Sequence, residues 1–207
     1  MTFGNLITFE GPEGADKSTQ IALLEDRLKK DGVDVVRTFE PGGGSRLSAD
    51  LRKILLSENY EQICCETELF LMLASRAEHV QKLILPALAK GSVVLCDRFI
   101  DSTTAYQGYG RGLPVKTIQL MNQFAIMGRY PDLTVIIDID SAKGLERAAR
   151  KAGLDRIESA GQEFHSQVRE GFKSLSTEDD RYFLVDGDRS LSTIHEDIYS
   201  RVIRILK

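Results

Sequence analysis

Residues 5–20, NLITFEGPEGADKSTQ, decide the fold of this chain. Residues 6–9 form a short apolar run with β-branched members, and such a run indicates a buried strand. Residues 11–17 then turn the chain, and a helix-like stretch follows at residues 19–30. A strand, a glycine-containing turn, a Lys-Ser pair and a helix are the context that a phosphate-binding loop needs. The stretch therefore predicts such a loop, with a chance glycine-rich turn as the alternative.

The predicted loop directs positive potential at one anion. Glycines let backbone N–H groups point inward, and the N-terminus of the following helix adds its dipole. We expect Lys17 to reach the β- and γ-phosphates of a nucleotide, and Ser18 to place its hydroxyl on Mg²⁺.

One residue departs from the phosphate-loop pattern G-x-x-x-x-G-K-[ST]. The pattern requires glycine at position 16, where this chain has Asp16. At about 4 Å, a pair of unit charges interacts by roughly 1 kcal/mol in water and about 4 kcal/mol at an effective dielectric near 20. The side chain also obstructs the close approach to phosphate that glycine permits. We therefore expect Asp16 to weaken binding of a triphosphate.

Length and composition bound the class of protein. The chain has 207 residues, of which 42% are hydrophobic and 28% charged. We expect one globular α/β domain over residues 1–207, with two small domains as the alternative that this length allows. A net charge of −4 argues against non-specific nucleic-acid binding. No apolar run reaches about 18 residues, and no basic region precedes the apolar N-terminal run. Neither a membrane span nor a signal peptide is predicted.

The cysteines indicate a reducing compartment. The chain has three of them, so they cannot all pair, and none has metal-ligand spacing with a histidine. We expect reduced thiols in the cytoplasm that serve as packing residues: Cys64, Cys65 and Cys96.

Strand-like and helix-like segments alternate along the chain. Strands are expected at residues 6–9, 33–39, 92–96, 133–138 and 182–185, and helices at 19–30, 47–56, 67–90, 115–127, from 142, 164–175 and 191–206. The alternation predicts a five-stranded parallel sheet covered by helices on both faces. Ligands of such sheets bind outside the carboxyl ends of the strands. Five candidate residues lie at or near these ends: Gly11, Glu40, Asp97, Asp140 and Asp186.

Two further stretches suggest chemistry. At the end of the third strand, Asp97 is placed to lie near Mg²⁺ and Arg98 to hold a second phosphate bidentately; a salt-bridged strand end is the alternative. Residues 101–112, DSTTAYQGYGRG, are rich in hydroxyl, amide and aromatic groups and too glycine-rich at their end for a plain helix. Their composition suits recognition of a flat polar ring and a sugar, with a solvated loop as the alternative.

A basic segment near residue 150 is the last candidate. It holds four basic residues, Arg147, Arg150, Lys151 and Arg156. A loop that delivers arginines to a transferring phosphoryl group has this composition. A solvated charged face is the alternative, and it applies equally to Glu40, Arg52 and Arg76.

Five motifs, in order, carry a resemblance to a family: FEGPEGADKST, EPGG, LASRAEH, DRFIDSTTAYQGYGRGL and LDRIE. Their order and spacing resemble those of bacterial thymidylate kinases, from residue 6 to about residue 186. The resemblance implies a P-loop NTPase fold of the nucleoside monophosphate kinase type. It also implies transfer of the γ-phosphoryl group of ATP to dTMP, giving dTDP and ADP, with Mg²⁺ and in a homodimer.

The same resemblance implies site residues. The ATP site would comprise Gly11, Glu13, Gly14, Ala15, Asp16, Lys17, Ser18, Thr19 and Arg147, the last stacked on adenine. The dTMP site would comprise Glu13, Arg52, Met72, Arg76, Arg98, Thr103, Tyr106 and Gln107. The catalytic set would be Lys17, Asp97, Arg98, Arg150 and Arg156, with Ser18 and Asp97 at the metal.

Within the implied dTMP site the roles differ. Glu13 would meet the 3′-hydroxyl, and Tyr106 would lie against the deoxyribose and disfavour a 2′-hydroxyl. Arg52 and Arg98 would hold the acceptor phosphate. The thymine edge would be contacted by Arg76, Thr103 and Gln107.

The catalytic arginine is expected in a lid at about residues 148–160. Some family members place it in the phosphate loop, but this loop has no arginine, whereas the lid has Arg150 and Arg156. Besides Asp16, two residues depart from many bacterial members. Phe39 replaces an arginine, and Met72 replaces a phenylalanine that stacks on thymine; methionine covers a ring face less rigidly.

Two rival interpretations stand beside a dTMP kinase. The first is a nucleotide-binding pseudo-kinase impaired by Asp16. The second is a kinase for another monophosphate, or a switch that hydrolyses GTP. The Asn/Thr-Lys-x-Asp run that reads guanine in such switches is absent from this sequence.

Overall fold

A computed structural model describes residues 3–57, 63–152 and 156–206. Its centre is a five-stranded sheet with the strand order β2-β3-β1-β4-β5, in which every neighbouring pair is parallel. The strands are β1 (Leu6–Glu10), β2 (Val35–Phe39), β3 (Val93–Asp97), β4 (Leu133–Asp138) and β5 (Tyr182–Asp186). The predicted fold class is confirmed, and each expected strand forms with bounds that shift by at most two residues.

Burial explains the order of the strands. The central strand β1 is buried at all five positions, and an uninterrupted apolar run suits a strand covered on both faces. The edge strands β2 and β5 each expose residues. Phe9 pairs with Asp97 of β3 and with Val135 of β4, so the carboxyl ends of the central strands meet at one edge.

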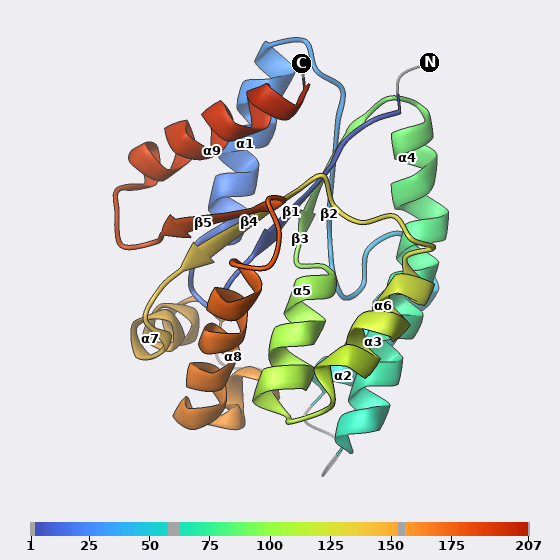
Figure 1. Cartoon of the computed structure of the whole chain (residues 1–207), viewed down its shortest axis with the longest axis vertical. Coiled ribbons are helices and arrows are strands. Elements are labelled where there is room, and N and C mark those ends of the chain that lie inside the picture. The colour runs from blue at the N-terminus through green and yellow to red at the C-terminus, as the bar shows by residue number, and fades with distance from the viewer. Residues whose placement is uncertain (1–2, 58–62, 153–155, 207) are drawn as a thin grey trace.

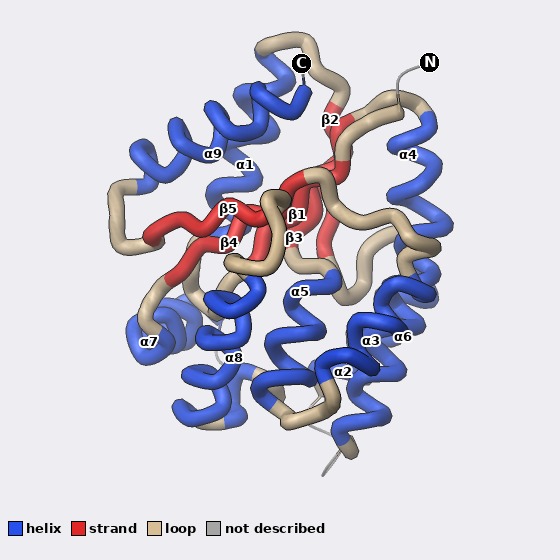
Figure 2. The backbone as a smooth tube through the Cα atoms, viewed as in Figure 1, coloured by secondary structure: helices blue, strands red, loops and turns tan. Residues whose placement is uncertain are grey.

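Helices cover both faces of the sheet (Figure 2). One face carries α1 (Lys17–Lys30) and α9 (Leu191–Leu206), which lie side by side in Figure 1. The remaining helices are α2 (Arg46–Leu56), α3 (Cys65–His79), α4 (Leu85–Ala89), α5 (Ile100–Thr103), α6 (Val115–Ala125), α7 (Ser141–Ala152) and α8 (Gln162–Leu175). Within the described ranges, no helix has both the length and the apolar character that crossing a bilayer requires.

Alternate residues of β1 enter different cores. Ile7 and Phe9 pack with Leu24 and Ile198 on the side of α1 and α9. Leu6 faces the other side of the sheet and packs in a second cluster with Phe99 and with Leu88 of α4. Because successive side chains of a strand point to opposite faces, β1 packs against both helical layers. The loop that follows β1 therefore begins from a strand held on both faces.

The segment expected as one helix at residues 67–90 is interrupted. α3 ends at His79, a π-helical turn covers Val80–Ile84, and α4 begins at Leu85. Pro86 lies at the start of α4. Proline has no N–H to donate and its ring clashes with the carbonyl four residues earlier, so a regular α-helical ladder cannot continue through this point.

Residues 101–112 do not form the solvated loop that was the alternative interpretation. α5 continues into a π-helical segment, Thr104–Gly110, and the side chains of residues 103–108 are buried. Gly110 allows close packing on α8, because a Cβ there would lie 2.5 Å from the Phe164 ring. The composition that favours a loop instead serves a tight helix contact.

All three cysteines are free thiols, but they do not share one role. Cys96 is fully buried in the core below α4, as expected of a packing residue. Cys64 is exposed, so the expectation that it packs in the core is wrong. It lies directly before α3.

Candidate active site

The predicted phosphate loop connects β1 to α1, and its backbone requires glycine. Gly14 has φ +66°, and a Cβ there would lie 2.1 Å from the Gly144 carbonyl oxygen of α7. Lys17 is the first residue of α1, and its ammonium donates to the carbonyl oxygens of Gly11 at 3.1 Å and Pro12 at 2.7 Å. Burial, with the nearby Arg98 charge, lowers the pKa of Lys17 to about 8. The loop thus encloses one cation whose charge is poorly solvated.

Asp16 adopts the backbone conformation that glycine would have at this position. Its φ of 58° and ψ of 28° are left-handed, a region that aspartate tolerates better than most residues. Its carboxylate lies 3.4 Å from the Arg147 guanidinium of α7, which is also 3.9 Å from Asp188. The loop therefore keeps its shape, and an arginine balances the added charge.

The two predicted metal ligands meet between α1 and β3. The Ser18 hydroxyl donates to Asp97 Oδ2 at 2.6 Å. A hydroxyl and a carboxylate are oxygen donors that suit Mg²⁺, which otherwise relies on substrate phosphates and water. No group of three or more His, Cys, Asp or Glu that could hold a metal occurs among the residues that the structure describes. The pair fits an ion that arrives with a nucleotide.

Arg98, Glu13 and Tyr106 form a second charged cluster beside the loop. Glu13 Oε1 accepts from Arg98 at 2.7 Å and from the Tyr106 hydroxyl at 2.6 Å. Burial raises the pKa of Glu13, but the charges of Arg98 and Lys17 and these hydrogen bonds outweigh it and lower that pKa to about 2. Arg98 also donates to Ser102 Oγ at 3.0 Å. Glu13 therefore stays ionised and fixes both partners.

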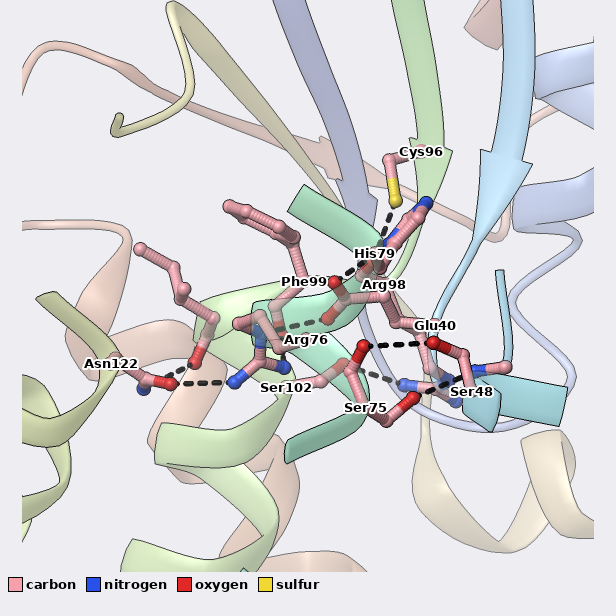
Figure 3. Close-up of polar contacts among 12 residues, drawn as sticks. Glu40, Ser48, Ser75, Arg76, His79, Cys96, Arg98, Phe99, Ser102 and Asn122 are labelled. Atoms are coloured by element: carbon pink, nitrogen blue, oxygen red, sulfur yellow. Dashed lines mark hydrogen bonds and ion pairs between the residues drawn. The ribbon is translucent and has the colours of Figure 1, made fainter. Parts of the chain in front are cut away.

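Arg76 lies deeper, on α3, and is only 2% exposed. Its guanidinium donates to Glu40 at 2.7 Å, to Asn122 Oδ1 at 2.5 Å and to the Phe99 carbonyl oxygen at 3.0 Å. Figure 3 shows the contact with Asn122. An arginine has five N–H donors, so these three hydrogen bonds leave two N–H groups that can donate to a ligand.

Two more predicted dTMP ligands have protein partners. The Gln107 amide donates to Glu68 at 2.8 Å. Arg52 donates to the Pro41 carbonyl oxygen at 2.9 Å, and its guanidinium lies 5.5 Å from the Phe39 ring centre. Phe39, one of the departures from the family pattern, thus forms a face against which Arg52 lies.

These residues share one cavity of about 980 Å³. Fifteen of the predicted site residues line it: Glu13, Gly14, Ala15, Asp16, Lys17, Ser18, Thr19, Arg52, Met72, Arg76, Asp97, Arg98, Thr103, Tyr106 and Gln107. Met72 lines this cavity while Phe70, two residues earlier on α3, is 57% exposed. The phosphate loop and the residues of the predicted dTMP site therefore open onto the same space.

Four predicted residues do not line the cavity, although Gly11 contributes its carbonyl to Lys17 and Arg98. Arg147 pairs with Asp16. Arg150 pairs with Glu146 on α7, and its side chain is 75% exposed. Arg156 bonds Glu68 at 2.6 Å and the Leu55 carbonyl oxygen at 2.9 Å. Residues 153–155 of the predicted lid lie outside the described residues, and the role of the lid stays a prediction.

Sequence reasoning missed several residues of the site. Arg37 and Ser102 line the cavity, and Asn122 and Glu68 hold Arg76 and Gln107. The sequence contained a signal for Asn122, because this polar residue shares the buried face of α6 with Ile118 and Ala125. A polar residue on a buried helical face needs a partner.

The parallel sheet, the loop between β1 and α1 and the cavity that this loop shares with Asp97 and Arg98 define a P-loop nucleotide kinase. A family model described as thymidylate kinase matches residues 9–198. The chain is 48% identical to "Thymidylate kinase" of Halothermothrix orenii over 202 residues, 96% of each chain. It is 47% identical to that of Pseudomonas putida strain GB-1, covering 94% of this chain and 93% of the relative. The chain belongs to the thymidylate kinase family.

Membership of this family confirms the predicted enzyme class and the predicted reaction, phosphorylation of dTMP to dTDP by ATP. A third relative, from Exiguobacterium sibiricum, is 40% identical over 99% of this chain and has the same description. None of these comparisons favours the pseudo-kinase interpretation.

Proposed function

We propose that ATP and dTMP meet end to end in the cavity, ATP on the phosphate loop and dTMP on the side of residues 97–112. The observation that carries this proposal is that Lys17 and Ser18 line the same cavity as Arg98, Tyr106 and Gln107. An oxygen of the dTMP phosphate attacks the γ-phosphorus of ATP, and the bond from that phosphorus to the β,γ-bridging oxygen breaks. The protein positions the two phosphates and neutralises their charge.

Each charged residue has a distinct task in this proposal. Lys17 binds the β- and γ-phosphates, and Arg98 binds the acceptor phosphate close to Asp97. Ser18 and Asp97 would hold Mg²⁺, which when bound offsets negative charge on the transferring group. Glu13 keeps Arg98 oriented and offers a carboxylate to the 3′-hydroxyl.

Turnover of nucleoside monophosphates with Mg-ATP tests the substrate. We expect dTMP to be phosphorylated with a kcat/KM well above those of UMP, CMP and GMP. Donors on Arg76 and Gln107 suit the carbonyl edge of thymine and not the amino groups of cytosine and guanine, and Tyr106 disfavours the 2′-hydroxyl that UMP carries. Omission of Mg²⁺ in the presence of EDTA should abolish turnover. A higher kcat/KM for any of the other three monophosphates would contradict the substrate assignment.

Replacing Asp16 by glycine is expected to lower the KM for ATP about fivefold. The change removes one negative charge near the triphosphate, worth about 1 kcal/mol in a solvated site. It also relieves the left-handed conformation of a residue with a side chain. Asp16→Asn is the matched control, because it removes the charge but keeps the side chain.

The two variants separate charge from shape. If the charge dominates, Asp16→Asn should give most of the gain, and the gain should shrink at high salt. If neither variant changes the KM for ATP, the pairing of Asp16 with Arg147 already cancels the charge, and the expected impairment is absent.

We also propose that the protein is a cytoplasmic homodimer formed through α2, α3 and α6. These helices neighbour one another and expose large apolar side chains: Leu47, Phe70, Leu120 and Phe124, the last 88% exposed. Such a surface suits a second copy of the chain. Sedimentation velocity should give a dimer for the wild type and a monomer for Phe124→Asp; a monomeric wild type at micromolar concentration contradicts the proposal.

A further inference from the structure

Arg76 is held on three sides by groups from different parts of the chain. Glu40 follows β2, Phe99 follows β3 and Asn122 belongs to α6. Glu40 is ionised and buried, because the charge of Arg76 and the hydrogen bond from His79 lower its pKa despite burial. Asn122 is the uncharged side chain of the three contacts, and it is 2% exposed.

The chemistry of the contact fixes the orientation of the Asn122 amide. A guanidinium can only donate, so the amide oxygen must face Arg76, and the distance from this oxygen to the guanidinium is 2.5 Å. The amide nitrogen then donates to the Ile100 carbonyl oxygen at 3.3 Å. Asn122 therefore links the arginine to the start of α5, which also carries Thr103 and leads to Gln107.

We propose that Asn122 is a positioning residue for base selection: it holds the Arg76 guanidinium so that its free donors face the carbonyl edge of thymine. The inference rests on the proposed function, in which Arg76 reads the base. Cytosine presents an amino group where thymine presents a carbonyl oxygen, so a fixed guanidinium favours thymine and repels cytosine. A loosened guanidinium loses this discrimination.

Removal of the Asn122 side chain should affect selection of the base more than the stability of the fold. Asn122 also lines a second cavity, of about 600 Å³, and Arg76 is not among the described residues that line it. Water in that cavity can hydrogen-bond the Ile100 carbonyl oxygen that loses the amide, because Ile100 lines the cavity together with the polar Asp101 and Gln119. Glu40 and the Phe99 carbonyl still hold the guanidinium, so its charge stays compensated.

The experiment compares Asn122→Ala with the wild type in steady-state turnover of dTMP and dCMP. The alanine variant should raise the KM for dTMP about tenfold and lower the dTMP/dCMP ratio of kcat/KM by a similar factor, the effect of one hydrogen bond to a charged group. The KM for ATP should change less than twofold. A purely structural role would move both KM values together with the melting temperature.

Two further variants sharpen the test. Asn122→Asp keeps an oxygen acceptor for Arg76 but cannot donate to the Ile100 carbonyl oxygen, so its dTMP/dCMP ratio should lie between those of the alanine variant and the wild type. Asn122→Leu has the same branched shape but is apolar, and it replaces the alanine variant if that protein does not fold. Gln119→Ala is the matched control, because it removes an amide one turn earlier on α6 and should leave the ratio unchanged.

The outcomes separate this inference from the proposed function. A wild type without preference for dTMP would contradict the substrate assignment itself. A wild type that prefers dTMP, with Asn122→Ala and Asn122→Leu equally selective, would overturn the role of Asn122 alone. So would a loss of selectivity in the Gln119→Ala control as large as that in the Asn122 variants.

Discussion

Arg98→Ala is expected to lower kcat/KM for dTMP by about three orders of magnitude. Its guanidinium lies between Glu13 and Ser102 at the carboxyl end of β3, where the acceptor phosphate is proposed to bind. Its side chain is 17% exposed, so its charge acts with little screening by solvent. An arginine at the reacting phosphates contributes about 10³–10⁵ to kcat, and the acceptor phosphate proposed to bind Arg98 carries the attacking oxygen. The loss should appear both as a lower kcat and as a higher KM for dTMP.

Two controls define what Arg98 contributes. Arg98→Lys keeps the charge but cannot contact phosphate bidentately, so its activity should lie between wild type and alanine. The KM for ATP should change little in either variant, because Lys17 and the loop bind the donor. A loss below tenfold for Arg98→Ala would contradict the proposed role.

A readout independent of turnover comes from Glu13. Its folded pKa of about 2 lies below the ordinary 4.5, so its contribution to stability is present above pH 4.5 and lost as the pH falls toward 2. Arg98 provides the largest lowering influence on this pKa. In Arg98→Ala the pKa of Glu13 should rise, and NMR titration of its carboxyl carbon would measure the change.

The phosphate loop was predictable because its parts are contiguous. Strand, turn, Lys17 and helix follow one another within the 25 residues from Leu6 to Lys30, and local chemistry alone assembles them. The same holds for the strand ends that carry Asp97 and Arg98. Alternation of apolar strand-like segments with helix-like segments also predicted the sheet. A strand buried on both faces consists of consecutive apolar residues, so its burial can be recognised from the sequence alone.

The support for Arg76 was not predictable in this way. Its partners Glu40 and Asn122 lie 36 and 46 positions away, and tertiary packing alone brings them together. For the same reason, the glycines of residues 101–112 argued against a plain helix and left a solvated loop as the alternative, whereas Gly110 packs against Phe164 on a helix distant in sequence. The composition of such a segment does not predict its conformation, because that conformation depends on packing against a helix distant in sequence.

Arg156→Ala is expected to lower kcat by about 10²–10³, whereas Arg150→Ala should stay within about threefold of the wild type. The next residue along the chain, Ile157, is 7% exposed and lines the cavity, so the backbone that carries Arg156 borders the site. Arg150 instead forms a solvent-exposed pair with Glu146 within α7. A surface pair of this kind contributes little.

In this structure Arg156 binds Glu68, which also accepts from Gln107, so the arginine must leave that carboxylate to reach the transferring group. Single-turnover kinetics isolates this step, because the chemical rate should fall in Arg156→Ala while the affinities for ATP and dTMP stay near those of the wild type. Glu68→Gln provides the matched variant: it keeps the acceptor for Gln107 but weakens the hold on Arg156, and should not reduce the chemical rate as Arg156→Ala does. If Arg150→Ala loses more activity than Arg156→Ala, the assignment is reversed, and the exposed arginine of α7 is the one that reaches the phosphoryl group.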